Sequence, residues 1–174
     1  MPMHYADMCD EVRAFMIEEV DYDGDGLYIS SYFTPVGAAS WREMLLQACQ
    51  YGDDSTLARA IESGPHLKSY TERRTKKGFT QVRVPYNAHE TIADSNFSRF
   101  YLRGVCRLAA VRGVADLIGY RAMEVAQPRP GSQEKINARF AAAAMLDDLR
   151  ATMDRNPALG MPPGVGSGIL ARFP

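Results

Sequence analysis

The sequence contains only three cysteines in 174 residues, and they lie far apart. An odd and widely spaced set does not build the disulfide framework of a small secreted domain. Because Cys9, Cys49 and Cys106 each fall in a segment of apolar periodicity, we expect buried reduced thiols rather than metal ligands or catalytic groups. A domain of this length buries roughly 70% of the surface that its unfolded chain exposes, so its core needs no cross-link.

Long hydrophobic runs are also missing. The longest, Phe140 to Leu146, has seven residues and is mostly alanine, whereas a helix that crosses a bilayer needs about 20 apolar residues. The first residues lack the basic region followed by an apolar region that marks a secretory signal. We therefore expect a protein that neither spans nor binds a membrane.

Neither sign of charge dominates the composition, with 20 Lys and Arg against 21 Asp and Glu, but the charges are unevenly distributed. Residues 1–62 carry twelve acidic and three basic residues, and residues 63–112 carry ten basic and three acidic residues. Such asymmetry has two interpretations. Either the two parts pack together and neutralise each other, or the basic part binds an external acidic partner.

Apolar periodicity predicts an α+β fold. Spacings of three and four residues predict helices over 5–20, 40–48, 54–63, 87–112 and 141–153. Alternation and β-branched or aromatic residues predict strands over 27–33, 80–84 and 117–125. We expect one globular domain over residues 1–154, with several helices packed on a small, mostly antiparallel sheet.

Residues 155–174 contain four prolines and four glycines, which predict an extended C-terminal arm rather than a helix or a central strand. The arm ends in three apolar side chains, Ile169, Leu170 and Phe173. A stiff extended segment loses little entropy when it binds. The three residues are therefore predicted to bind a partner, by docking into a groove of a neighbouring molecule.

A second candidate for partner binding is basic. Arg99, Arg103 and Arg107 are spaced by four, which places three guanidinium groups on one side of the long helix, where we expect them to be exposed. Upstream, a loop carries Arg73, Arg74, Lys76 and Lys77. Together these residues are suited to phosphates or to an acidic protein surface. The alternative is a solvated helix face, or pairing with the acidic first third of the chain.

No motif for metal binding or catalysis is complete. The segment from Asp21 to Gly26 matches the first six positions of a calcium-binding EF-hand loop, but Tyr32 stands where position twelve requires a glutamate. An acidic turn is the simpler interpretation. The only adjacent acid–base pair, His89 and Glu90, opens a helix, where the helix dipole favours a glutamate. We expect no catalytic, cofactor-binding or metal-binding residues, and hence no enzyme.

From residue 70 to 174 the chain resembles a group of short proteins encoded among the genes of tailed bacteriophages and prophages. The resemblance is carried by the strings TERRTKKG, NFSRFYLRGVCRLAAVRG, YRAMEVAQPRPGS and LGMPPGVGSG. It implies a non-enzymatic virion structural protein, a head–tail connector or a capsid-associated component, which lies in the host cytoplasm before assembly. Its partners would be its own copies and the portal, capsid or tail proteins.

A function from another class stays open. The basic region between residues 73 and 107 also suits a small phage-encoded protein that binds nucleic acid or interferes with the host. Rings of identical copies, or co-purification with particles, would favour the structural role. A monomer with salt-sensitive nucleic-acid binding would favour the alternative.

Overall fold

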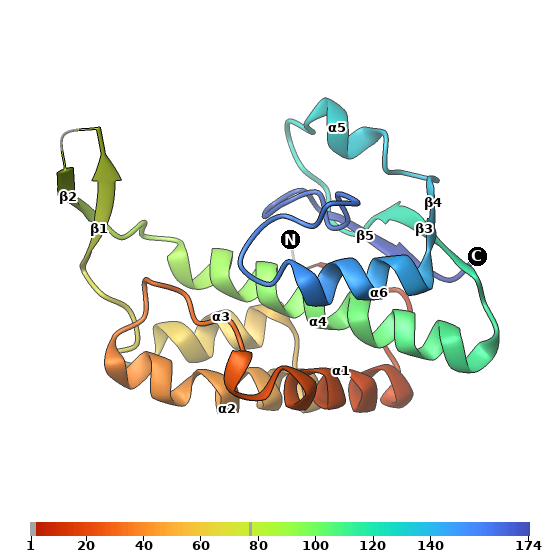
Figure 1. Ribbon diagram of the computed structural model, residues 1–174, viewed down its shortest axis with the longest axis horizontal. Coiled ribbons are helices and arrows are strands. Elements are labelled where there is room, and N and C mark those ends of the chain that lie inside the picture. The colour runs from red at the N-terminus through yellow and green to blue at the C-terminus, as the bar shows by residue number, and fades with distance from the viewer. Residues whose placement is uncertain (1–2, 77) are drawn as a thin grey trace.

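In the computed structural model, which describes residues 3–76 and 78–174, one long helix passes through the centre of the molecule (Figure 1). This helix, α4 (Ala88–Arg112), buries almost every side chain from Asn96 to Ala109, on all of its sides. A helix buried all round belongs to the core. Although α4 has 25 residues, neither it nor any other helix of the described residues is long and apolar enough to cross a membrane.

Three helices cover one side of α4: α1 (Asp10–Asp23), α2 (Pro35–Tyr51) and α3 (Asp54–Glu62). Helix α2 begins earlier than the helix predicted over residues 40–48, because the Thr34 side chain accepts a hydrogen bond from the Gly37 N–H. Pro35 then occupies the first helical position, where a missing N–H costs nothing. Helix α3 begins where the sequence predicted, at Asp54, and Asp53 before it forms a capping box with Thr56.

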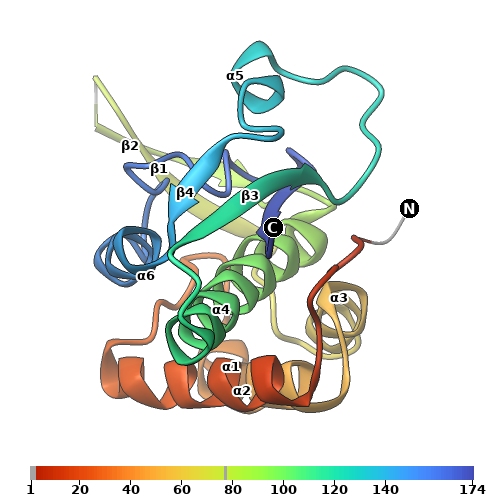
Figure 2. The same ribbon diagram turned by 90° about the vertical axis from the view of Figure 1, so that its right-hand side faces the viewer.

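A three-stranded antiparallel sheet lies over the other side of α4, next to α6 (Ala142–Ala151) (Figure 2). Its central strand β3 (Asp116–Arg121) pairs with β4 (Arg139–Ala141) and with β5 (Ile169–Arg172). Two short helical segments, a 3₁₀ turn (Gly24–Gly26) and α5 (Pro130–Gln133), lie in the connections. The second sheet is a hairpin of β1 (Tyr70–Thr75) and β2 (Gly78–Arg83). The predicted α+β class is thus confirmed.

The strand predicted over residues 27–33 is wrong. Only Phe33 forms an isolated β-bridge, with Leu67. Leu27 and Phe33 are buried against the helical layer, and the Trp41 indole donates to the Tyr28 carbonyl (2.9 Å). Leu27 and Phe33, two of the residues that suggested a strand, therefore fill the helical core.

The helix predicted from Tyr5 begins only at Asp10. Tyr5 instead lies against the rings of Phe97 and Tyr101 on α4, with ring centroids 5.0 and 4.9 Å apart. The Tyr101 hydroxyl accepts a hydrogen bond from the Asp7 N–H. These contacts favour a non-helical path of the chain across α4.

The C-terminal segment folds onto its own domain, so the expectation that the core ends near Met153 is wrong. Met161, Ile169 and Leu170 are fully buried and belong to the same core as α1 and α4. Strand β5 pairs with the edge of β3 that β4 leaves free, which satisfies the backbone of both strands. The predicted boundary between residues 154 and 155 does not separate two structural units.

The three cysteines are free in the structure. Cys49 and Cys106 are buried, and burial raises the pKa of both thiols to about 12. At neutral pH these two are therefore protonated, as expected for core residues. Cys9 is half-buried at the start of α1.

Candidate functional site

The hairpin of β1 and β2 stands away from the rest of the molecule at the end where α4 begins (Figure 1). Its register runs from the pair Tyr70 and Arg83 at the base to the pair Thr75 and Gly78 at the tip. Because directly opposed residues share a face, each face of the hairpin follows from this register. One face carries Tyr70, Glu72, Arg74, Phe79, Gln81 and Arg83.

Both faces of this hairpin are exposed. Among its described residues only Thr71 and Val82 are half-buried, and both lie near the base. Phe79 is 73% exposed and Tyr70 is 58% exposed. A two-stranded hairpin is marginally stable without a surface to pack on. Large aromatic side chains left in water on such an element are typical of a surface that a partner covers.

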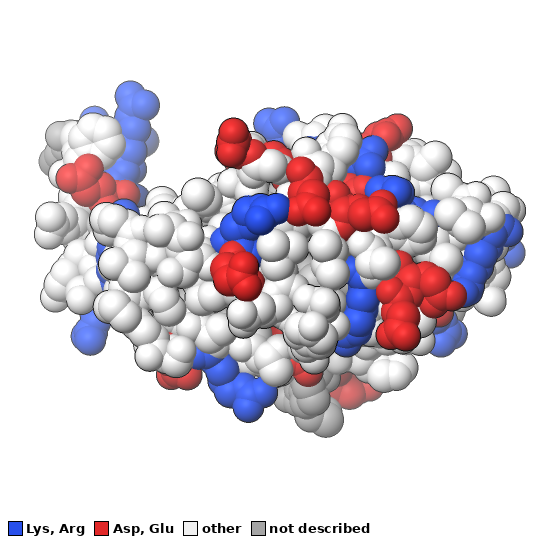
Figure 3. Space-filling view, turned by 90° about the horizontal axis from the view of Figure 1, so that it is seen from below, with Lys and Arg blue, Asp and Glu red and all other residues white. Residues whose placement is uncertain are grey.

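The hairpin gathers positive charge with little compensation. Arg73, Arg74 and Arg83 are exposed on the strands, and Lys76 is exposed at the turn. The space-filling view shows Lys and Arg side chains projecting at this end of the molecule, whereas the face of α1 and α2 mixes both signs (Figure 3). The structure thus leaves Arg73, Arg74 and Lys76 accessible, as predicted, and Lys77 lies outside the described residues.

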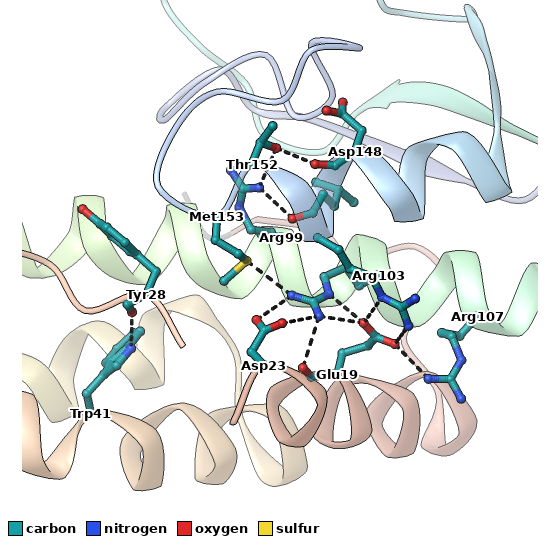
Figure 4. A network of polar contacts seen from close by, with 12 residues as sticks. Glu19, Asp23, Tyr28, Trp41, Arg99, Arg103, Arg107, Asp148, Thr152 and Met153 are labelled. Carbon is teal, nitrogen blue, oxygen red and sulfur yellow. Dashed lines mark hydrogen bonds and ion pairs between the residues drawn. The ribbon is translucent and has the colours of Figure 1, made fainter. Parts of the chain in front are cut away.

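The arginines of α4 are a correction to the sequence analysis, because they are not an exposed stripe (Figure 4). The Arg103 side chain is 0% exposed and bonds to the carboxylates of Glu19 (2.8 Å) and Asp23 (2.7 Å). Arg107 is partly exposed and bonds to Glu18 and Glu19, both at 2.8 Å. Their spacing of four turns them toward α1, so pairing with the acidic first third is the correct interpretation.

Glu19 is the centre of this network. Arg103, Arg107 and Arg150 all donate hydrogen bonds to its carboxylate, which is itself fully buried. Burial by itself raises the pKa of Glu19, but the hydrogen bonds from Arg150, Arg107 and Arg103 outweigh burial and lower the pKa to about 2. The network links α1, α4 and α6, so it stabilises the fold and does not form a free surface.

Arg99 is buried on the same helix but bonds to a different set of groups. Its guanidinium donates to the carbonyl of Leu149 (3.1 Å) and the carbonyl of Arg155 (2.8 Å). A third hydrogen bond reaches the Thr152 hydroxyl. These acceptors lie at and just after the end of α6, where helix carbonyls lack partners, so Arg99 caps α6. It is not accessible to a partner.

The apolar arm residues are likewise part of the domain rather than free to dock into a neighbour. Ile169 and Leu170 are buried in β5. Phe173 packs against the core under the Arg112 guanidinium, 5.4 Å from the ring centroid, and its N–H donates to the Asp7 carboxylate. The docking hypothesis for these three residues is therefore wrong, because their own domain offers the nearest apolar surface.

The residues of the two remaining motifs, the Asp21–Gly26 segment and His89, contact neighbouring side chains of the domain. Asp21 pairs with Arg42, and Asp23 pairs with Arg103, so two of the presumed calcium ligands are engaged by arginines. Across residues 3–76 and 78–174 no group of three or more His, Cys, Asp or Glu side chains is placed to hold a metal ion. The Nε2 atom of His89 lies 3.9 Å from the Oε2 atom of Glu62, at a groove between α3 and α4.

The exposed aromatics of the hairpin were missed by the sequence analysis. Thr80, Val82 and Val84 predicted one strand, but the preceding basic segment was interpreted as a loop. The signal that identifies β1 is the glycine at the turn, Gly78, because the residues before it form a second segment long enough for a strand. Once the register is known, Tyr70 and Phe79 lie opposite Arg83 and Arg74.

Comparison of the chain with models of protein families, with curated proteins and with solved structures found no match. The functional argument therefore rests on the hairpin itself.

Proposed function

We propose that this protein is a non-enzymatic assembly component that binds its partner through the β1–β2 hairpin. The observation that carries the proposal is a two-stranded hairpin with both faces exposed, on which Tyr70 and Phe79 stand beside Arg74 and Arg83. Tyrosine, phenylalanine and arginine are the residues enriched at protein interfaces. The hairpin adds nothing to the core, so binding a partner is the use that accounts for it.

The resemblance of residues 70–174 to phage-encoded proteins gives this role a setting. We propose a virion structural protein of a tailed phage, at the head–tail connector or on the capsid. Its partners there would be copies of itself and the portal, capsid or tail proteins. Such assemblies are built from heterologous contacts, in which a projecting element of one molecule meets a different surface of the next.

The experiment is mass spectrometry of purified phage particles, with the wild-type chain and with the variant Tyr70→Ser, Phe79→Ser. We expect the wild-type chain in constant ratio to the other structural proteins and the variant to be depleted at least tenfold. A matched control is Tyr51→Ser, which removes an aromatic side chain that is 80% exposed on α2. Absence of the wild-type chain from particles, or undiminished incorporation of the variant, would contradict the proposal.

The alternation of arginine and aromatic side chains favours a second candidate function, binding of single-stranded nucleic acid. Bases stack on aromatic rings, and arginines contact the phosphates, with affinity that falls steeply as salt rises. The hairpin offers such a surface, whereas Arg99 and Arg103 of α4 are buried. Retention of a single-stranded oligonucleotide at low salt, lost in the variant Arg74→Glu, Arg83→Glu, would support this candidate. No retention at low salt would exclude it.

A further inference from the structure

A groove of about 600 Å³ lies between α3 and the first turns of α4, at the end of the molecule that carries the hairpin. Four carboxylates line it, two from each helix. They are Asp54 and Glu62 on α3, and Glu90 and Asp94 on α4. The only arginine among the lining residues is Arg59, so acid prevails in the groove.

The carboxylates occupy two levels. Glu62 and Glu90 are exposed at the rim. Asp94 lies deeper and is fixed by the Gly166 N–H (2.8 Å) and the Ser98 hydroxyl (3.2 Å). Burial raises the pKa of Asp94 and of Asp54. Poorly solvated carboxylates gain more from an approaching cation than carboxylates in open water do.

Apolar side chains also line the groove. Met3, Ala58, Met123 and Val165 contribute side chains between the acidic positions. A surface that combines carboxylates with methionine and small apolar groups suits a partner that combines cations with large hydrophobic side chains. The volume lies within the range of ligand pockets, ~300–1000 Å³, so the groove admits a few side chains but not a pair of strands.

The exposed hairpin face has this complementary composition, with Arg74 opposite Phe79 and Arg83 opposite Tyr70. The hairpin of the same molecule projects away from α3 and α4 (Figure 1). Among the described residues no ion pair joins the hairpin to the residues that line the groove. We propose that the hairpin of one copy docks into the acidic groove of a second copy, placing its arginines against Glu62 and Glu90. This inference rests on the proposed function and names the partner as the chain itself.

The contact joins two different surfaces, so it is heterologous. Each molecule carries one hairpin and one acidic groove. When one of these surfaces is occupied, the other remains free to bind a further copy. Repetition of the contact yields rings if the rotation closes and open chains if it does not. Opposed charges make the association sensitive to salt.

Sedimentation velocity of the full chain at low and high salt tests the docking. The hairpin variant is Arg74→Glu, Arg83→Glu, and the groove variant is Glu62→Lys, Glu90→Lys. We expect the wild-type chain to associate at low salt and each variant alone to associate at least tenfold more weakly. A mixture of the two variants restores association, because the unchanged hairpin of one variant meets the unchanged groove of the other, and the acidic hairpin meets the basic groove. Circular dichroism verifies that both variants are folded.

Two charge-matched controls exclude a general effect of net charge. Arg139→Glu, Arg155→Glu and Glu43→Lys, Glu134→Lys change exposed residues that belong to neither the groove nor the hairpin, and both should associate as the wild-type chain does. A wild-type chain that stays monomeric, or a mixture that does not associate, overturns the docking between copies. If the variant Tyr70→Ser, Phe79→Ser is depleted from particles in that case, the proposed function stands and the hairpin binds a different protein.

Discussion

Glu19 is a single carboxylate that three arginines share, and its removal leaves buried positive charge. We expect Glu19→Gln to lower the free energy of unfolding by about 3–5 kcal/mol, because Arg103 has 0% exposed side-chain area and loses one of its two anionic partners. Urea unfolding followed by circular dichroism measures the loss. Glu18→Gln is the control, since Glu18 pairs only with Arg107 and is 55% exposed. Equal stability of the two variants would refute the role given to Glu19.

The same residue sets a pH dependence. Its pKa is lowered from 4.5 to about 2 in the folded protein. A carboxyl group with a depressed folded pKa stabilises the protein fully above its unfolded pKa and loses that contribution as the pH falls through the folded pKa. We therefore expect about 3 kcal/mol of stability to be lost between about pH 4.5 and pH 2. In Glu19→Gln the unfolding free energy should fall less over this interval, and an unchanged pH profile would contradict the assignment.

At the scale of elements, α1 and α4 approach each other at Gly104. A Cβ atom there would lie 2.8 Å from the Val12 carbonyl oxygen and 3.0 Å from Met16 Cγ. We expect Gly104→Ala to destabilise the fold by about 1–3 kcal/mol, because overpacking forces the two helices apart. Gly131→Ala in α5 is the control, since a Cβ at that position meets no atom within 4 Å. Thermal unfolding measures the stability of both variants. An unchanged stability of Gly104→Ala would show that the two helices separate easily.

The hairpin has little connection to the core. The Val84 N–H donates to the Ser69 carbonyl at 3.0 Å, so the two ends of the hairpin are already adjacent. We expect replacement of residues 70–83 by a short Gly/Ser linker to leave the free energy of unfolding within about 0.5 kcal/mol of the wild-type value. Differential scanning calorimetry measures this. A drop of several kcal/mol would mean that the hairpin stabilises the domain, and its exposure would then need another explanation.

For the whole molecule, the C-terminal segment closes the core. We expect Leu170→Ala to cost about 2–5 kcal/mol, because Leu170 is fully buried in β5. Truncation after Met153 removes Met161, Ile169 and Leu170 together and should prevent stable folding. Leu159→Ala is the control for the point substitution, since Leu159 is 38% exposed. Chemical unfolding measures the stability of both point variants and of the truncated chain. A truncated chain that unfolds as the full chain does would support a separate C-terminal arm.

Much of the fold could be predicted from local signals in the sequence. Apolar spacings of three and four residues predicted helices over 87–112 and 54–63, which match α4 and α3 closely. This signal acts over a few residues, because the period of the helix sets which side chains share a face. Of the candidate site, the basic residues Arg73, Arg74 and Lys76 were identified for the same reason: a local charge run is visible without a fold.

Tertiary structure decided which of the singled-out residues face water. The sequence pattern predicted an exposed Arg103 and drew no attention to Phe79, yet the arginine is buried among carboxylates and the phenylalanine is exposed. The position of β5 beside β3 and the pairing of α4 with α1 both depend on contacts between residues far apart in the chain. A charge is buried only where the fold supplies a partner of opposite sign, and an apolar side chain only where it supplies a neighbouring surface. Local sequence carries neither piece of information.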